Sequence, residues 1–279
     1  MITIKQIESP VVVTDGVTDV NLYAGQTYTC EVPVVNEWFE MEIDTRISGD
    51  SPSDSFQIPT RYGNILIEWG DGVVEYISQI NQTTDPRLLH QYATEGIYNI
   101  KIKGDVQWRT TSIGERNKII GISNFGTLIF RDVSNWFWDC NNLVLTATDS
   151  PNSAIDNLSS VFFGCQNLTN MPNFNGCYIK SMTSTFEGVV IGNLGSYDLR
   201  NCLGMTNFAR YSAWSTDNYN ASLMGFLRMQ AGDTAPPTGW ILRSNVPFHG
   251  GSAIATGDGL VARNYLINVL NWTITDSTP

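Results

Sequence analysis

The residues of this chain best suited to chemistry are two histidines and a few scattered acids. His90 and His249 are its only histidines, and Asp71 lies in a Trp-Gly-Asp-Gly sequence where it could be a calcium ligand or a catalytic acid. No second carboxylate stands at ligand spacing beyond Glu75. We therefore interpret Asp71 as a turn residue that bonds its own backbone, and His90 as a hydrogen-bonded core or turn histidine rather than a catalytic base.

A glycosidase would need two carboxylates that face one cleft, about 5 to 10 Å apart. The candidates for such a pair are Glu75, Asp132, Asp139 and Asp149. The sequence contains no G-x-S-x-G, H-E-x-x-H, G-x-x-x-x-G-K or strand-to-helix G-x-G-x-x-G motif. We expect no catalytic site and no cofactor, and a depolymerase of host polysaccharide remains the enzymatic alternative.

The cysteines do not follow a metal-binding pattern. The five are Cys30, Cys140, Cys165, Cys177 and Cys202. Their number is odd and no C-x-x-C spacing occurs, so we expect no zinc site and no other metal. Most of them stand near Phe and Leu, where a free thiol acts as a small buried hydrophobe. A disulfide such as Cys165 to Cys177 is the alternative.

Composition sets further bounds on the class of protein. With 279 residues, 42% of them hydrophobic and 11% aromatic, the chain can bury a sizeable core in one or two domains. Charged residues make up 15%, against about 25% in typical soluble domains. A net charge of −11 without a Lys/Arg run disfavours nucleic acid and anionic membrane surfaces. We also expect neither membrane insertion nor a signal peptide, because no apolar run is long enough.

Part of the sequence repeats. Ser134–Leu143 (SNWFWDCNNL) aligns with Ser159–Leu168 (SSVFFGCQNL) at an offset of 25 residues. The aligned pairs are Phe137 with Phe162, Cys140 with Cys165, Asn142 with Asn167, and Leu143 with Leu168. An offset of 23 residues carries Met182 onto Met205 and Phe163 onto Phe186. Such periods indicate stacked units that bury their apolar faces against one another, so we expect Phe163 to be buried.

The polar residues of the repeats admit two interpretations. Asn142, Asn167, Asn170 and Asn173 suit turns in which side-chain amides satisfy backbone groups of successive coils. Exposed Trp, Tyr and Asn could instead form a carbohydrate-binding ladder. The aromatic-x-x-Cys-x-Asn-Leu unit resembles the BspA-like, Mycoplasma-type leucine-rich surface repeats, best over Ile155–Gly188. The chain departs from that pattern where Cys140 follows Asp139 rather than Gly, and where Phe186 is followed by no Cys.

A second pair of motifs precedes the repeats. The segment Ile97–Lys103 alternates, with Tyr98, Ile100 and Ile102 on one side of a half-buried strand. The residues of the two motifs are Trp69, Gly70, Asp71 and Gly72, followed by His90, Tyr92, Gly96 and Tyr98. Over Phe39–Gly104 they resemble the polycystic-kidney-disease (PKD) type of immunoglobulin-like β-sandwich. The resemblance implies that the two motifs pack together, with Trp69 in the core.

The C-terminal part reads as a cap for the last repeat. A helix is expected in the segment NYNASLMGFLRMQ, with Leu223, Phe226 and Leu227 on one face and Asn218 or Asn220 as its N-cap. A second helix in GDGLVARNYLINVL and a strand in NWTITD follow. Solenoids require such terminal caps for solubility.

Together these features predict a mainly β protein. We expect an N-terminal β segment (1–36), an Ig-like, PKD-type sandwich (37–110), an irregular leucine-rich-repeat solenoid (111–216) and a small α/β cap (217–279). The expected function is that of a non-enzymatic bacteriophage virion protein: a capsid decoration, head-fibre or tail-fibre component. Its expected partners are other capsid or tail proteins, a host surface glycan or protein, and further copies of itself. The alternative is a secreted bacterial or protist BspA-like adhesin at the cell surface.

Overall fold

The protein is mainly β, with two α-helices among the residues that its structure describes. The structure, a computed structural model, describes the chain except residues 1, 5–10, 15–18, 23–27, 31–35, 113, 132–133, 152–154, 169, 175–176 and 279. The chain divides into two compact units, Met1–Asn36 and Glu37–Pro279.

The first unit contains two antiparallel strand pairs. The strands are β1 (Ile2–Ile4), β2 (Val11–Thr14), β3 (Asp19–Leu22) and β4 (Tyr28–Cys30). Strand β1 pairs with β4, and β2 pairs with β3. The sequence predicts β structure in each of these four runs, because each is short, rich in β-branched residues and bounded by turn residues.

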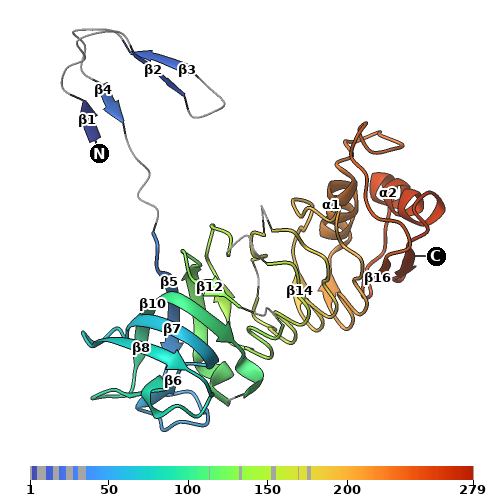
Figure 1. Cartoon of the computed structure of the whole chain (residues 1–279). Helices are drawn as coiled ribbons and strands as arrows, with labels where there is room; N and C mark the ends of the chain where they lie inside the picture. The colour runs from blue at the N-terminus through green and yellow to red at the C-terminus, as the bar shows by residue number, and fades with distance from the viewer. Residues whose placement is uncertain are drawn as a thin grey trace. The chain divides into compact units, whose positions relative to one another are not determined.

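The second unit begins with a large sheet, which has seven strands within the described residues. These strands are β5 (Phe39–Asp44), β7 (Thr60–Glu68), β8 (Val74–Ile80), β10 (Ile97–Trp108), β11 (Ile119–Asn124), β12 (Ile129–Phe130) and β13 (Val144–Leu145). The order is β13-β11-β5-β10-β7-β8, with β12 beside β10. Strands β6 (Ser55–Gln57) and β9 (Leu89–Gln91) form a separate pair. The sequence predicts the end of the sandwich at residue 110. Because β11 pairs with β5, the sheet continues beyond that residue (Figure 1).

Strand β10 is the best-predicted element of the sheet. Ile100 and Ile102 are fully buried, whereas Lys101 and Lys103 on the other side are only partly covered. The alternation predicted from the sequence is therefore confirmed. The buried side packs against large aromatic residues, and the ring centroids of Phe39 and Trp108 lie 5.6 Å apart.

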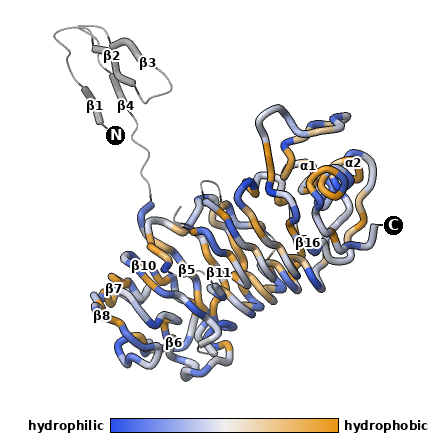
Figure 2. Tube along the Cα trace, turned by 45° about the vertical axis from the view of Figure 1, so that its right-hand side comes forward, coloured by the Kyte–Doolittle hydropathy of each residue, from blue (hydrophilic) through white to orange (hydrophobic). Residues whose placement is uncertain are grey.

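Beyond the sheet, segments from successive repeats lie side by side in parallel. The N–H of Phe137 donates to the carbonyl of Val161 at 2.9 Å, and that of Phe162 donates to the carbonyl of Thr185 at 3.1 Å. Short strands β14 (Val190–Ile191) and β15 (Ala213–Trp214) pair in the same parallel sense. We call the segments around residues 135–139, 160–164, 184–188 and 207–211 the stacked turns. They follow one another along the second unit in Figures 1 and 2.

Each stacked turn contains two left-handed residues four positions apart. The pairs are Asn135 and Asp139, Ser160 and Gly164, Ser184 and Gly188, and Asn207 and Tyr211. The spacing between corresponding residues becomes slightly shorter at each step along the stack. The turns are thus equivalent in backbone conformation although their lengths differ.

A column of phenylalanine rings fills the interior of the stacked turns. Phe162 lies between Phe137 and Phe186, with ring centroids 5.7 and 5.9 Å away. All three residues are fully buried. Phe163 is only half-buried, and its ring stacks on Trp138 at 5.5 Å. The predicted alignment of Phe163 with Phe186, and the prediction that Phe163 is buried, are therefore wrong, because Phe162 is the residue whose ring stacks on Phe186.

The C-terminal part contains helices α1 (Thr216–Leu227) and α2 (Gly257–Asn268) and the parallel strands β16 (Pro247–His249) and β17 (Thr273–Thr275). Met205 of the last regular turn bridges to Phe248 in parallel. The predicted face of α1 is buried at Leu223, Phe226 and Leu227. Its predicted N-cap is wrong: the hydroxyl of Ser215 accepts the N–H of Asn218 at 3.2 Å, so the helix begins earlier.

Candidate functional site

The two motifs singled out in the sequence meet where β7 ends, between the large sheet and strand β9. The indole of Trp69, at the end of β7, stacks on the imidazole of His90 in β9, with ring centroids 4.6 Å apart. The rings of Tyr92 and Tyr98 stack at 3.7 Å. Trp69 and Tyr92 are buried. The chain therefore brings these residues together, as the resemblance implies.

Hydrogen bonds fix the polar groups of this cluster. Oδ2 of Asp71 lies 2.8 Å from Nε2 of His90, and Oδ1 accepts the N–H of Val73 at 3.1 Å. Burial alone would raise the pKa of Asp71, but the hydrogen bonds from His90 and Val73 hold that pKa below its usual value. Asp71 thus closes the turn between β7 and β8.

The other residues of the two motifs also have structural contacts. The hydroxyl of Tyr92 donates to the carbonyl of Trp69 at 3.0 Å, and burial raises the pKa of that hydroxyl. Gly70 has φ of +88°, and a Cβ there would lie 2.5 Å from the carbonyl oxygen of Asn99. Gly72 also has a left-handed backbone, with φ of +96°. The N–H of Gly96 donates to the hydroxyl of Thr45 at 2.9 Å. These contacts give the residues of the two motifs a packing role where β7 ends.

The candidate carboxylates serve separate local contacts. Glu75 accepts the indole N–H of Trp69 at 2.9 Å. Asp139 lies 3.9 Å from the guanidinium of Arg116, and Asp149 accepts the N–H of Phe125 at 2.9 to 3.0 Å. Asp132 lies outside the described residues. None of the three described acids is hydrogen-bonded or ion-paired to another of them.

Four of the cysteines are buried free thiols: Cys140, Cys165, Cys177 and Cys202. The alternative disulfide between Cys165 and Cys177 is not formed. Burial raises the pKa of Cys177 and that of Cys202 to about 11, so both are protonated at neutral pH. The thiol of Cys165 donates to the carbonyl of Phe137, in the preceding turn, at 2.9 Å. These groups act as part of the packing.

The stacked turns bear out the predicted use of asparagine amides. The Nδ2 of Asn142 donates to the carbonyl of Asn117 at 2.8 Å, and that of Asn170 donates to Leu145 at 2.9 Å. Asn173 bonds in the same way to the carbonyl of Thr148. Asn167 is exposed. The aligned leucines, Leu143 and Leu168, are fully buried.

A buried ion pair was not found by sequence reasoning. Nζ of Lys118 lies 3.3 Å from Oε2 of Glu115, and both side chains are fully buried. The ammonium also donates to the carbonyls of Ser51, Pro52 and Ser55 at 2.9 to 3.0 Å. The pair thus fastens the turn-rich loop that precedes β6. Nothing in the sequence indicated it, because that loop and the pair belong to distant segments of the chain.

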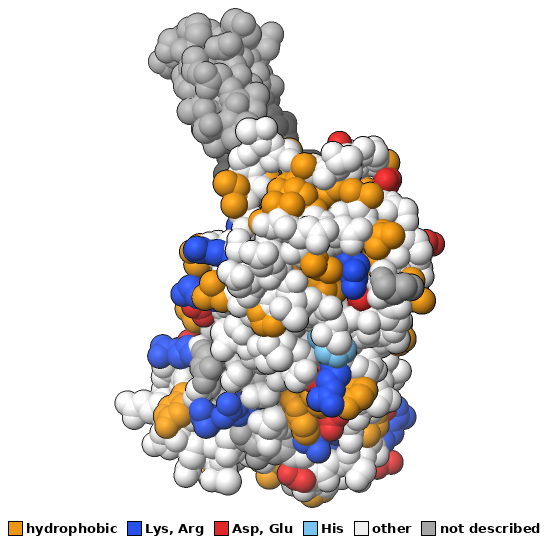
Figure 3. Space-filling view, turned by 90° about the vertical axis from the view of Figure 1, so that its right-hand side faces the viewer, with side chains coloured by type: hydrophobic (Ala, Val, Ile, Leu, Met, Phe, Trp, Pro, Cys, Tyr) orange, Lys and Arg blue, Asp and Glu red, His pale blue; other side chains and the backbone are white. Residues whose placement is uncertain are grey.

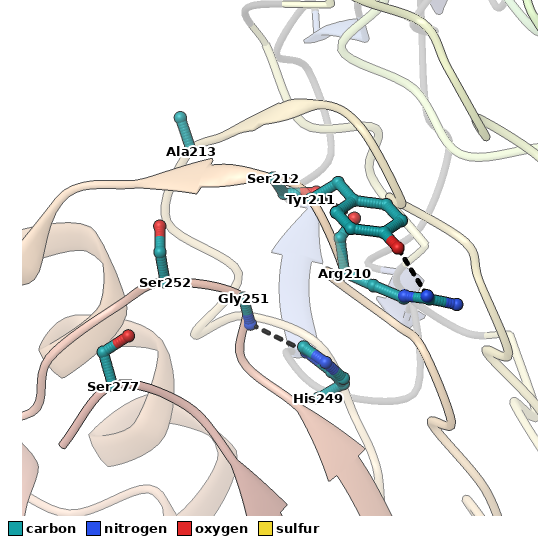
Figure 4. A pocket seen from close by; sticks show the side chains of 8 residues that line it. All are labelled: Arg210, Tyr211, Ser212, Ala213, His249, Gly251, Ser252 and Ser277. Carbon is teal, nitrogen blue, oxygen red and sulfur yellow. Dashed lines mark hydrogen bonds between the residues drawn. The ribbon is translucent and has the colours of Figure 1, made fainter. Parts of the chain in front are cut away.

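A cavity of about 670 Å³ lies where the last regular turn meets the C-terminal cap (Figure 4). It is lined by Arg210, Tyr211, Ser212, Ala213, His249, Gly251, Ser252 and Ser277. The Arg210 guanidinium lies 4.4 Å from the centre of the Tyr211 ring. Nδ1 of His249 accepts the N–H of Gly251 at 3.1 Å. Burial, helped by the charge of Arg210, lowers the pKa of His249.

This cavity is the candidate ligand site, because it combines hydrogen-bond donors, hydroxyls and an exposed aromatic ring. Sequence reasoning noted His249 but not its neighbours. Figure 3, which views the second unit from its C-terminal side, shows basic and acidic side chains scattered among uncharged ones. In the described residues, no three His, Cys, Asp or Glu side chains gather as a metal site would require. The described helices are too short or too polar to cross a bilayer.

Family models, curated protein sequences and solved structures were compared with the chain, and none matched.

Proposed function

We propose that the second unit joins a PKD-type, Ig-like β-sandwich to an irregular leucine-rich-repeat solenoid of the BspA-like kind, closed by an α/β cap. The packing of the two motifs around Trp69 and His90 supports the first assignment. In the proposed sandwich, the strand pair β6–β9 forms the smaller of the two sheets. The parallel hydrogen bonds between turns and the phenylalanine column support the second.

On this fold we propose a non-enzymatic bacteriophage virion protein, used as a capsid decoration, head-fibre or tail-fibre component, that presents its repeat surface for adhesion. The observation that carries the proposal is the column of rings Phe137, Phe162 and Phe186. Stacking of successive turns builds an extended lateral surface. The side chains that could take part in catalysis in other proteins, such as Asp71, His90 and the buried cysteines, here contribute to packing and turn structure.

In this proposal the N-terminal or PKD-like region docks to other capsid or tail proteins and the repeat face points outward. The chain assembles as a homo-oligomer on the particle, since most protein oligomers are symmetric assemblies of identical chains. Its outer ligand is a glycan or protein of the host surface.

The test is incorporation into particles. Gradient-purified particles of the phage that encodes the chain are analysed by mass spectrometry for its peptides. A particle lacking the gene is then mixed with the full chain, with residues 37–279, or with residues 111–279. We expect the full chain to co-sediment and residues 111–279 to remain free. Absence of the chain from particles would refute the function, and co-sedimentation of residues 111–279 would refute the division of labour.

A further inference from the structure

Tyr211 is an outlier among equivalent positions of the stacked turns. The N–H of Gly164 donates to the carbonyl of Glu187, and that of Gly188 donates to the carbonyl of Arg210. These bonds make Asp139, Gly164, Gly188 and Tyr211 structurally equivalent. All four have φ between +59° and +74°. Glycine adopts this conformation freely and Asp tolerates it, whereas a bulky side chain is strained there.

Packing does not offset the strain at Tyr211. Its side chain is 76% exposed, so the ring buries little apolar area when the protein folds. The structure therefore holds an aromatic ring in solvent at a position where the neighbouring turns use glycine. Strain of this kind that folding does not explain is a reason to look for a ligand.

The ring is held together with a cation. The Arg210 guanidinium lies over the Tyr211 ring and donates to its hydroxyl. Arg210 takes part in none of the ion pairs found among the described residues. A guanidinium has five N–H donors in a planar fork, so donors remain for a carboxylate.

Other residues that line the cavity supply further hydrogen-bonding groups. Because Nδ1 of His249 accepts the N–H of Gly251, the neutral imidazole carries its proton on Nε2, where it is a donor. The hydroxyls of Ser252 and Ser277 line the same cavity from two other segments, and both residues are exposed (Figure 4). The three segments meet only because the cap closes on the last turn.

The charges nearby favour a ligand with a single negative charge. Glu187 and Asp276 act on His249 through their charges in opposition to Arg210. Asp276 is itself bound by the guanidinium of Arg263 at 2.9 Å. With two acids and one unpaired guanidinium acting on His249, the site suits a carboxylate better than a phosphate dianion, which carries more negative charge.

We propose that this cavity binds one unit of an acidic saccharide, a sugar that carries a carboxylate. The apolar face of the sugar stacks on Tyr211, the carboxylate accepts from Arg210, and the hydroxyls bond to His249, Ser252 and Ser277. The inference rests on the proposed adhesion to a host surface and names the chemistry of the ligand.

The test is calorimetric titration of the full chain with trisaccharides of galacturonate, glucuronate and sialate, with their methyl esters and with inorganic phosphate. The esters keep the rings and hydroxyls but lose the charge. We expect at least one acid to bind at least tenfold more tightly than its ester. Tyr211→Gly should weaken that binding at least tenfold without lowering the thermal midpoint, because glycine relieves the strain. Arg210→Gln should abolish the preference for acid over ester.

The matched control is Tyr76→Ala, which removes a similarly exposed tyrosine on β8 and should bind as the parent does. The proposal is overturned if none of the acids binds, if phosphate alone binds, or if Tyr211→Gly binds as tightly as the parent. These outcomes are independent of particle incorporation. A chain that co-sediments with particles but binds no acid refutes the saccharide site alone, and one that binds acid but is absent from particles refutes the virion role alone.

Discussion

The large sheet and the stacked turns bury aromatic residues by different means. In the sheet, β5, β7, β8 and β10 are antiparallel, and alternation along β5 and β10 decides which of their side chains enter the core. In the stacked turns, the strands are two residues long, and left-handed residues set the path of the chain. The sheet thus depends on local pattern, whereas the turns depend on agreement between successive repeats.

This difference decides how each region tolerates change. A strand inside the sheet has partners on both sides along its length. A stacked turn meets its neighbours through a few backbone bonds and one ring in a column, so loss of one ring affects the contacts on both sides.

The largest effect is expected in the ring column. Phe162→Ala removes a fully buried ring between two others and should lower the free energy of unfolding by about 3 to 5 kcal/mol. Phe163→Ala, one residue away, removes a half-buried ring and should cost about 1 kcal/mol. Urea denaturation of the two variants measures both values. Equal losses would mean that the column does not run through Phe162.

The sheet region has its own sensitive point in the pair of Lys118 and Glu115. Lys118→Met leaves a buried carboxylate without its cation and should destabilise the protein by about 3 kcal/mol. Adding Glu115→Leu removes that unpaired charge, so the double variant should recover part of the loss. Denaturation of the single and double variants gives the comparison. A double variant less stable than Lys118→Met would contradict the assignment of the cost to the buried charge.

The amide bonds between turns should contribute less. Asn142→Ala removes one bond to the carbonyl of Asn117 and should cost about 1 kcal/mol. Asn167→Ala, at an exposed position of the next turn, is the matched control and should change stability by less than about 0.5 kcal/mol. Thermal melts of the two variants measure the difference. The reverse order of stability would mean that these amides do not support the stack.

The smallest effect concerns acid and the cap that closes the stack. Burial would raise the pKa of Asp276, but hydrogen bonds from Arg263 and Tyr219 hold it below the ordinary 3.8. The folded state therefore binds fewer protons than the unfolded state. The stability from this group is present above pH 3.8 and is lost as pH falls through the folded-state pKa. Stability measured from pH 6 to pH 3 should fall less steeply in Asp276→Asn than in the parent.

The sequence predicts the sheet better than the turns for physical reasons. The alternation of β10 and the Asp-Gly turn at Asp71 are local features, and both agree with the structure. The existence of the repeats is also visible. The sequence does not show which phenylalanine of each repeat joins the ring column, because Phe162 and Phe163 are adjacent and the repeat length changes from turn to turn.

The remaining misses depend on contacts that no local pattern encodes. Lys118 and Glu115 are buried only because a loop from another part of the chain covers them. The cavity at Tyr211 forms where three distant segments meet. A signal for it did exist: at the offset that carries Met182 onto Met205, Tyr211 falls on Gly188, an unusual replacement in a turn.

The most direct test of the stacked turns is a cross-link between adjacent turns. The hydroxyls of Ser159 and Ser181 lie 3.0 Å apart, so the pair Ser159→Cys and Ser181→Cys should form a disulfide on mild oxidation. Intact-mass measurement would show the loss of two hydrogens relative to the reduced protein. The pair Ser159→Cys and Thr206→Cys, which skips one turn, and the parent should remain reduced. A cross-link in the skipping pair, or none in the adjacent pair, would contradict the stacking.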